Sequence, residues 1–224
     1  MGEIRVSKTT GAEFISIQLL KFVANPNPIA ATITAFCDGI NTSQVNNIIE
    51  VLNELNLKID CIERQIGIKP YIDIQTFTDD ILPILQKSKD EFNAQKRKLY
   101  ATFLAACIHP DSLNCSNKLI FANYLDRLDY LSIYILNAVE NYIYERQLVE
   151  KIGSKYNSDM IPVHLLNLKY LGLVDEIDGE EYMKMASRRR GNIRFRNPER
   201  VRLYKRSRLG SEFLNFMMKG ITEN

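Results

Sequence analysis

Hydrophobic residues recur at helical spacing through much of the first half of the chain. Between residues 43 and 66 they lie three and four positions apart, as at the a and d positions of a heptad. Thr42 or Ser43 is a plausible N-cap, and Gly67 ends the segment. The seam consists of Ile48, Leu52, Leu55, Ile59, Ile62 and Ile66. This pattern predicts one long helix, whose seam packs either within the molecule or against a second copy.

A second long helix is predicted to begin at Thr78, with acidic residues in its first turn, and to continue to Cys107. The two long helices, joined by a short connection, should form an antiparallel hairpin. Residues 1–42 are predicted to add two short helices before it. We therefore expect a helical domain over residues 1–128 and a homodimer formed through residues 43–108.

The pattern changes at Asp129. Three shorter helices are predicted over residues 130–144, 148–156 and 162–171, the last with a proline in its first turn, where proline is tolerated. A strand follows Gly172, and after a long connection a second strand and a closing helix complete the chain. The sequence thus predicts a mainly α fold, in which a long helical hairpin precedes a three-helix unit with a small β-ribbon.

The third of these helices resembles the recognition helix of bacterial winged helix-turn-helix regulators. Leu165, Leu168 and Leu171 are similar to its inward leucines. Gly172 and the following Leu173-Val174 are similar to its exit into the first wing strand. The resemblance implies that the leucines pack on the other two helices. It also implies a third helix suited to a major groove and a ribbon suited to the adjacent backbone or minor groove.

The end of the chain carries a second part of the same resemblance. Tyr204, Ser207 and Gly210 are similar to the family's Tyr-x-Leu-Thr-x-x-Gly pattern, with serine for threonine. Arg206 stands where the family has leucine. The resemblance covers residues 129–224 and implies that they form a winged-helix domain with a returning strand and a closing helix.

Two segments of the N-terminal half, Asp90-Glu91-Phe92 and Lys96-Arg97-Lys98-Leu99-Tyr100-Ala101, resemble a group of uncharacterised bacterial and phage-associated helical proteins. Some members of that group are tied to abortive phage infection. The resemblance carries over no activity and no catalytic residue. It makes a phage- or defence-related adaptor one functional alternative.

The charge is distributed unevenly along the chain. Residues 151–224 contain 15 Lys/Arg against 9 Asp/Glu, a balance of +6, whereas residues 1–150 contain 14 against 18, a balance of −4. Hydrophobic residues make up 46% and charged residues 25%, which is typical of a globular protein and excludes global disorder. A polyanion is therefore expected to bind at the C-terminal end, and the alternative is a soluble protein with two differently charged faces.

The long connection between the two wing strands is strongly basic. Residues 184–208 contain 11 Lys/Arg and one acid, Glu199. In Arg194-Phe195-Arg196 the alternation of a strand puts both arginines on one face. The candidate nucleic-acid-binding residues of this stretch are Arg188, Arg189, Arg190, Arg194, Arg196, Arg200, Arg202, Lys205 and Arg206. Such a wing can neutralise several phosphates, and it suits a narrow minor groove.

The outward face of the third helix offers fewer groups that could read bases. The candidates there are His164, Asn167 and Lys169. Asn167 can pair with adenine, and His164 can meet a guanine edge or a phosphate. Val163 and Leu166 are apolar where base readers are usually polar. Binding driven by backbone shape and charge, or a winged helix that contacts protein, fits this face at least as well.

Three interpretations of the basic wing follow. The first is a nucleic-acid-binding protein, with duplex DNA as the expected ligand, that contacts the backbone through the wing. The second is an interaction or adaptor protein that uses the winged helix and the helical hairpin as contact surfaces. The third is a wing that is merely solvated. No cofactor is expected in any of them.

Catalytic and metal-binding patterns are missing from the sequence. The four cysteines form no CxxC pair, and Cys107, His109 and Cys115 have no fourth ligand nearby. No GxGxxG, Walker-type, GxSxG or HExxH motif occurs. We therefore expect a protein that is not an enzyme, holds no metal and keeps its thiols reduced. A start without a signal-peptide pattern and the lack of a bilayer-length apolar segment predict a cytoplasmic protein without membrane contact.

Overall fold

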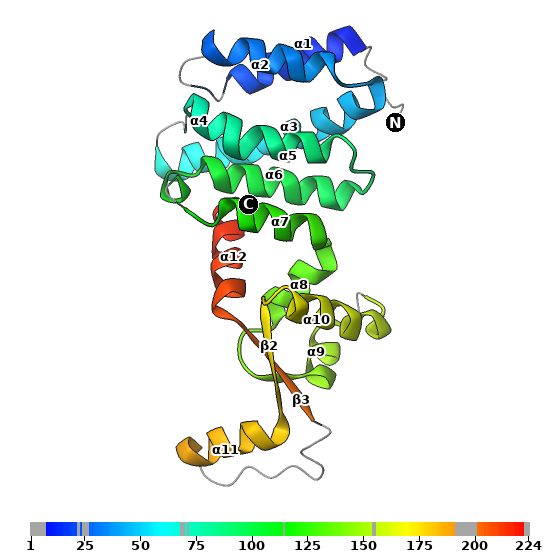
Figure 1. The fold of residues 1–224 in the computed structure, drawn as a ribbon, viewed down its shortest axis with the longest axis vertical. Coiled ribbons are helices and arrows are strands. Elements are labelled where there is room, and N and C mark those ends of the chain that lie inside the picture. Colours follow the sequence, from blue (N-terminus) through cyan, green and yellow to red (C-terminus); the bar gives the residue numbers. More distant parts are fainter. Residues whose placement is uncertain are drawn as a thin grey trace. The chain divides into compact units, whose positions relative to one another are not determined.

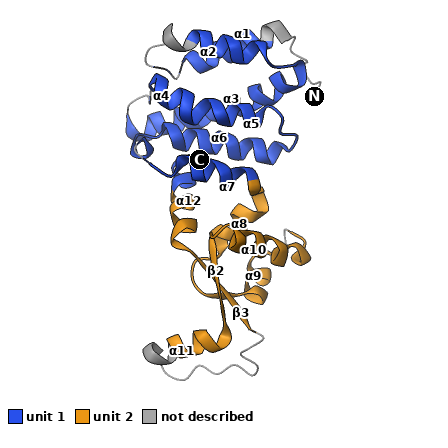
Figure 2. Cartoon of the chain, in the orientation of Figure 1, with its two compact units in different colours: residues 1–126, 216–224 blue, residues 127–215 orange. Residues whose placement is uncertain are grey.

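The computed structural model describes residues 8–21, 23, 27–67, 70, 72–113, 115–153, 156–190 and 201–221, with the backbone alone at residues 8–10, 27–29 and 186–190. The chain divides into two compact units, residues 1–126 with 216–224 and residues 127–215 (Figure 2). Most described residues are helical, and a small three-stranded antiparallel sheet belongs to the second unit (Figure 1). The mainly α fold class predicted from the sequence is therefore confirmed.

The first unit is built from helices. In chain order its elements are α1 (Lys8–Leu20), α2 (Asn27–Asp38), α3 (Thr42–Ile66), α4 (Ile74–Thr76), the π-helix η1 (Phe77–Ile81), α5 (Leu82–Ser88), α6 (Ala94–Ile108), the 3-10 helix η2 (Pro110–Ser112) and α7 (Lys118–Arg127). α3 contacts both α1 and α6 and is the centre of this packing (Figure 1). None of the described helices is long and apolar enough to cross a membrane.

α3 is the long helix predicted from the heptad pattern, and caps at both ends fix its length. Asn41, one position before the predicted caps, accepts a hydrogen bond on Oδ1 from the Gln44 backbone N–H at 3.0 Å. The Asn41 backbone N–H in turn donates to Gln44 Oε1 at 2.8 Å, which completes a capping box. Gly67 ends the helix with a φ of 73°, a left-handed conformation that glycine adopts without strain.

The heptad seam of α3 lies inside the first unit. Its members from Ile48 to Ile62 are all buried, and only Ile66, at the end of the helix, reaches the surface. Of the two alternatives left open by the sequence, packing within the molecule is therefore the observed one. The buried seam gives no support to the predicted homodimer through residues 43–108, because apolar surface already removed from water cannot stabilise a second interface.

The prediction of one long helix from Thr78 to Cys107 is wrong at its start. Asp73 accepts a hydrogen bond on Oδ1 from the Thr76 backbone N–H at 2.7 Å and so begins α4 upstream of Thr78. The π-helix η1 then leads into α5. An aspartate that bonds the backbone three residues ahead is a favourable N-cap, so this start was readable from the sequence.

The same prediction is also wrong in its middle, because the chain leaves the helix between α5 and α6. α5 ends at Ser88, and Asn93 begins α6 by accepting from the backbone N–H groups of Gln95 and Lys96. Asparagine side chains compete with helical backbone hydrogen bonds, so Asn93 favours a cap over a helix interior. Of these two helices, α6 makes most of the contact with α3 and begins beside the start of that helix, where Arg97 pairs with Glu50. α3 and α6 therefore run parallel, and the predicted antiparallel hairpin of two long helices is wrong (Figure 1).

The last described residues of the chain belong to the first unit. The Phe216 ring centroid lies 5.1 Å from that of Phe103 on α6 and 5.4 Å from that of Phe121 on α7. A Cβ at Gly220 would lie 1.9 Å from the Thr102 carbonyl oxygen, so only glycine permits this close approach. The sequence predicts that these residues belong to the C-terminal domain, whereas in the structure they supply part of the aromatic core around α6 and α7.

The second unit combines helices with the sheet. In chain order its elements are α8 (Tyr130–Ala138), β1 (Ile143–Tyr144), α9 (Glu145–Ile152), the 3-10 helix η3 (Ser158–Met160), α10 (Ile161–Tyr170), β2 (Val174–Asp178), α11 (Gly179–Arg190), β3 (Arg202–Arg206) and the first part of α12 (Arg208–Lys219). The strand order is β1-β3-β2, and both pairings are antiparallel. In this register Glu176 on β2 lies opposite Tyr204 on β3.

The three predicted helices of this unit are present as α8, α9 and α10, with shifted bounds. Asp129 caps α8 by accepting from the Ser132 backbone N–H at 2.7 Å. α8 ends at Ala138 instead of residue 144, because the last two residues of the predicted helix form β1. The β-branched and aromatic pair Ile143-Tyr144 suits a strand better than a helix end.

The leucines of α10 pack inward as the spacing predicted. Leu165 and Leu168 are fully buried, and Leu171 is buried at the end of the helix. Gly172 follows with a φ of 71° and turns the chain into β2. A side chain at this position would be strained, which explains why glycine is needed here.

Ser207 and Gly210 join the start of α12 to the turn after α10. Ser207 Oγ donates to the Gly172 carbonyl oxygen at 2.7 Å and accepts from the Gly210 backbone N–H at 2.9 Å. A Cβ at Gly210 would lie 2.2 Å from the Leu173 carbonyl oxygen. The serine therefore caps α12, and the glycine permits the helix to approach the turn.

Candidate nucleic-acid interface

His164 projects from α10 toward the start of α8. Its Nδ1 lies 2.9 Å from Ser132 Oγ and 3.5 Å from Asp129 Oδ1. Ser132 is buried, and its backbone N–H is already bonded to Asp129. His164 thus ties α10 to the N-terminus of α8 and presents little of its ring to a base edge.

The contact among a serine, a histidine and an aspartate raises the question of nucleophilic catalysis. In a catalytic triad the nucleophile and the carboxylate bind opposite nitrogens of the imidazole. Here Ser132 and Asp129 both lie at Nδ1 of His164, and the serine is buried. The arrangement is a helix-capping network and lacks the geometry of an activated nucleophile.

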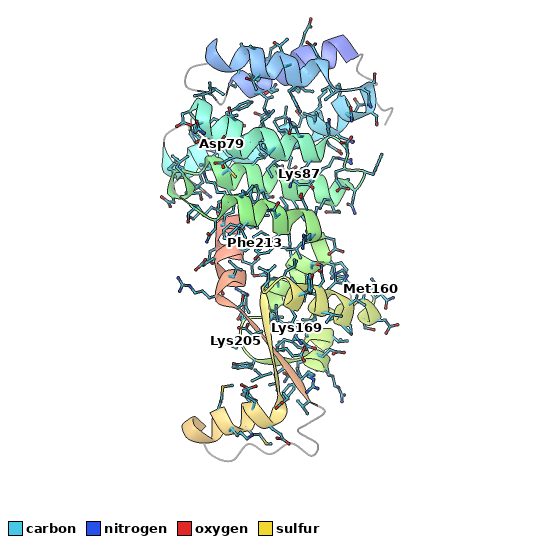
Figure 3. The ribbon with its side chains drawn as sticks, viewed as in Figure 1. Asp79, Lys87, Met160, Lys169, Lys205 and Phe213 are labelled. Carbon is cyan, nitrogen blue, oxygen red and sulfur yellow. The ribbon has the colours of Figure 1, made fainter. Side chains whose placement is uncertain are left out.

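The other two polar candidates on α10 are also held within the second unit. Asn167 Nδ2 donates to the Arg127 carbonyl oxygen at 3.3 Å. Lys169 Nζ, in the last turn of the helix, lies 3.0 Å from Glu176 Oε2 (Figure 3). Each contact uses one donor of its group and holds the side chain in place, so a base edge would have to compete with a partner within the unit.

Apart from Lys169, the residues that α10 leaves exposed are apolar or aromatic. Val163 is 57% exposed, Leu166 65% and Tyr170 82%, and Met160 just before the helix is also exposed. These four residues lie three, three and four positions apart, so they share one side of the helix. We call them the α10 apolar face. Contiguous exposed apolar residues of this kind are typical of a protein contact rather than of base recognition.

The basic connection between β2 and β3 contains a helix, α11, that the sequence analysis did not predict. Asp178 caps it by accepting on Oδ1 from the Glu181 backbone N–H at 2.8 Å. Glu180 and Glu181 lie in its first turn, where acidic side chains complement the helix dipole. The signal was present as a capping aspartate followed by acids and good helix formers.

α11 carries the backbone of Arg188, Arg189 and Arg190 in its last turn, and it contacts both strands of the hairpin from which it extends (Figure 1). The side chains of these three residues lie outside the described part of the chain. The other candidates outside it are Arg194, Arg196 and Arg200. We call residues 184–208 the basic arm.

Two basic candidates on β3 have partners of different kinds. Arg202 Nε lies 3.3 Å from Glu176 Oε1. Lys205 Nζ stands 5.5 Å from the centre of the Tyr142 ring, a cation–π distance (Figure 3). Lys205 keeps its charge uncompensated in this contact, whereas the charge of Arg202 is balanced by a carboxylate.

Arg206 serves the fold of the second unit. Its Nε donates to the carbonyl oxygens of Leu136 and Val139, both at 3.1 Å, and its Nη2 donates to the Asn137 carbonyl oxygen at 2.7 Å. These carbonyls end α8, so the guanidinium caps the negative end of that helix. Burial lowers the pKa of Arg206, and Glu140 partly offsets this. As a nucleic-acid contact this candidate is compromised, because its donors point at backbone.

Tyrosines surround the base of the basic arm. The Tyr142 and Tyr182 rings meet edge-on, with centroids 5.4 Å apart, and this contact holds α11. Tyr204 is buried, and burial, followed by the charge of Glu176, raises the pKa of Tyr204 to about 12. The sequence pattern pointed to Tyr204 but not to Tyr142, Tyr182 or Glu176, because the partners of these three residues lie far away in the chain.

Among the described residues no group of three or more His, Cys, Asp or Glu side chains could hold a metal ion. Cys37 and Cys107 are buried, and burial raises the pKa of both thiols. The thiolate form, which is the nucleophile and the metal ligand, is therefore disfavoured at these two positions.

Comparison of the chain with protein-family models, with curated proteins and with solved structures gave no match in any of the three.

Proposed function

We propose that the second unit is a winged-helix domain that binds nucleic acid, with duplex DNA as the expected ligand and the basic arm as the main contact. The observation that carries this proposal is the charge of the arm, 11 Lys/Arg against one acid in residues 184–208. Dense positive charge attracts phosphates, and its neutralisation releases the counterions condensed on the nucleic acid.

The order of elements supports the winged-helix part of the proposal. Three helices precede a β-hairpin, and β1 joins that hairpin from between α8 and α9. The inward leucines, the left-handed Gly172 and the Ser207–Gly210 cap also support it, because the resemblance rests on these residues.

Contact with the sugar-phosphate backbone is the binding mode we favour. Base readout in the major groove needs donors and acceptors that are available on the inserted helix. On α10 the three polar candidates bond within the unit, and the open side is the α10 apolar face. Affinity should therefore depend strongly on salt and weakly on base sequence.

A variant with Arg188, Arg189 and Arg190 all changed to Ala tests the proposal in the full chain. Fluorescence anisotropy with mixed-sequence duplex DNA at several salt concentrations should show weaker binding to all sequences alike. The slope of log K against log salt should fall by about 0.9 for each phosphate contact that is lost.

The matched control removes the same charge from exposed positions of the first unit, with Lys21, Arg64 and Lys98 changed to Ala. Its binding should stay close to that of the unchanged chain. Equal losses in the two triple variants would assign binding to net charge instead of the arm. Undetectable binding to DNA and RNA at low salt would refute the proposal altogether.

A protein-binding role of the second unit is the other candidate, and the α10 apolar face favours it. Three exposed apolar side chains on one helix have a free-energy cost in water that a partner's apolar surface would relieve. In this alternative α10 inserts into a protein groove, with Leu166 and Tyr170 as its largest contacts.

Leu166→Glu separates this candidate from the first. A partner recovered in stoichiometric amount after nuclease treatment should be lost on this change. It should be kept in Leu57→Glu, which alters an equally exposed leucine on α3. A partner that both variants retain would rule out the α10 apolar face as its binding site.

A further inference from the structure

Glu176 lies between α10 and β3 and bonds a cation from each. Its Oε2 is 3.0 Å from Lys169 Nζ, and its Oε1 is 3.3 Å from Arg202 Nε. Each carboxylate oxygen thus has its own partner. All three residues belong to the second unit, and the carboxylate links the candidate recognition helix to the strand that leaves the basic arm.

The two cations reach the surface while the acid lies beneath them. The side chains of Lys169 and Arg202 are 45% and 47% exposed, whereas that of Glu176 is 19% exposed. An anion approaching from solvent therefore meets the cations first. The three groups together carry one net positive charge, half of what the two cations would present alone.

Arg202 is also the residue of the basic arm at which β3 begins. The Gly179 backbone N–H donates to the Val201 carbonyl oxygen at 3.0 Å, which closes the base of the arm just before Arg202. Without Glu176, the positively charged side chains of the arm would form one basic surface with Lys169 on α10. The negative charge of Glu176 lies between Arg202 and Lys169.

We propose that Glu176 is an internal competitor for phosphate, which occupies Lys169 and Arg202 in the free protein and gives them up to the backbone of a bound nucleic acid. A carboxylate and a phosphate each offer two oxygens to such a pair of donors, and charge-assisted bonds to either are strong. This inference rests on the proposed function and adds to it a residue that limits affinity. Removal of the carboxylate charge should therefore strengthen binding.

Glu176→Gln tests the inference, because glutamine keeps the shape of the side chain and removes its charge. Anisotropy with duplex DNA at low salt should show binding about threefold tighter, the gain expected for removing one unit charge at about 6 Å from a phosphate in water. The slope of log K against log salt should also become steeper by about 0.9, because one more net positive charge meets the backbone.

Glu150→Gln is the matched control. Glu150 lies on α9 of the same unit and pairs with Arg146 at 3.2 Å, so the change removes an equal charge from another ion pair. Its affinity and salt slope should stay unchanged. Glu176→Asp, which keeps the charge, should bind no more tightly than the unchanged chain.

A folded Glu176→Gln variant that binds equally or more weakly would overturn the inference, since Glu176 would then only position its partners. If that variant unfolds, Glu176→Thr removes the same charge with a residue that favours strands. Its affinity is then judged by the same criteria. If the unchanged chain and all variants fail to bind, the proposed function falls as well, and that outcome is distinct from binding without a difference.

Discussion

The α10 helix and the basic arm belong to one unit, yet they differ in how their polar side chains are paired. On α10 every polar candidate is bonded to a neighbour, and apart from Lys169 the exposed side chains are apolar or aromatic. In the basic arm cations far outnumber acids, so most of its charge has no acid within the arm to balance it. The difference teaches that similarity to a recognition helix does not by itself give a helix that reads bases.

The contrast also separates residues that hold the unit from residues that can meet a ligand. Arg206 belongs to the basic arm by sequence, but its three hydrogen bonds to the end of α8 make it part of the scaffold. Lys205, its neighbour, makes a cation–π contact with Tyr142 and bonds none of these carbonyls. Two adjacent cations on one strand therefore differ in role.

The largest effect should come from Gly210→Ala, which should disturb the packing that supports both α10 and the basic arm. The added Cβ would lie 2.2 Å from the Leu173 carbonyl oxygen, so the start of α12 must move away from the turn after α10. We expect a loss of about 3 kcal/mol in the free energy of unfolding, the upper range for overpacking. Thermal and denaturant unfolding followed by circular dichroism measure it.

Gly39→Ala is the control for that experiment. Its Cβ would meet backbone oxygens only at 3.6 and 3.7 Å, which are ordinary contact distances. It should leave the free energy of unfolding nearly unchanged. Equal stability of the two variants would contradict the close packing of α12 described above.

Arg206→Leu and Lys205→Leu sharpen the contrast within β3. Loss of the guanidinium leaves three carbonyls at the end of α8 without their donor, which should cost about 2 kcal/mol of stability. Lys205→Leu should change stability by less than about 0.5 kcal/mol and should weaken nucleic-acid binding instead. If Lys205→Leu unfolds the protein and Arg206→Leu does not, the assigned roles are reversed.

The stability of the second unit should depend on pH at alkaline values, because Tyr204 on β3 is buried. The pKa of Tyr204 is raised to about 12, so the unfolded chain loses this proton first, near its ordinary value of 10.0. The stability that Tyr204 contributes is complete below pH 10 and is lost as the pH rises toward 12. At pH 11 the loss should be about 1.4 kcal/mol.

Tyr204→Phe removes this ionisable group and should reduce the decline of stability above pH 10 by that amount. Denaturant unfolding at pH 9 and pH 11 measures the difference between the two proteins. Identical declines would show that Tyr204 ionises as readily in the folded unit as in the unfolded chain.

The smallest effect is expected from Leu166→Lys, which adds a charge to the α10 apolar face. Leu166 is 65% exposed, so stability should change by less than about 0.5 kcal/mol. If the basic arm makes the main contact, affinity for duplex DNA should stay nearly constant. A gain of about threefold or more would place α10 against the phosphates and remove the contrast between the two surfaces.

The features that the sequence predicted are those that depend on neighbours in the chain. The α3 seam, the inward leucines of α10 and the turn at Gly172 follow from spacing and from backbone preferences over a few residues. The start of α6 at Asn93 and the start of α11 at Asp178 also have local signals, namely these two capping residues. The apolar period continues across Asn93, so the cap there was not predicted.

The site was harder to predict because its contacts join distant parts of the chain. His164 meets Ser132, and Arg206 meets the end of α8, across separations that no periodic pattern records. The sequence identified these residues by type and placed them on the correct elements. It could not show that their donors were already engaged, since that depends on how α8, α10 and β3 pack.

The placement of Phe216 and Gly220 against α6 and α7 has a consequence for biosynthesis. Residues 1–126 emerge from the ribosome long before Phe216 is synthesised. The aromatic cluster of Phe103 and Phe121 is complete only with Phe216. Domains generally fold as they emerge, N-terminal part first. Here the first unit must wait, with apolar rings uncovered, until the whole second unit has been translated. A premature stop close to the end would therefore damage the beginning of the protein.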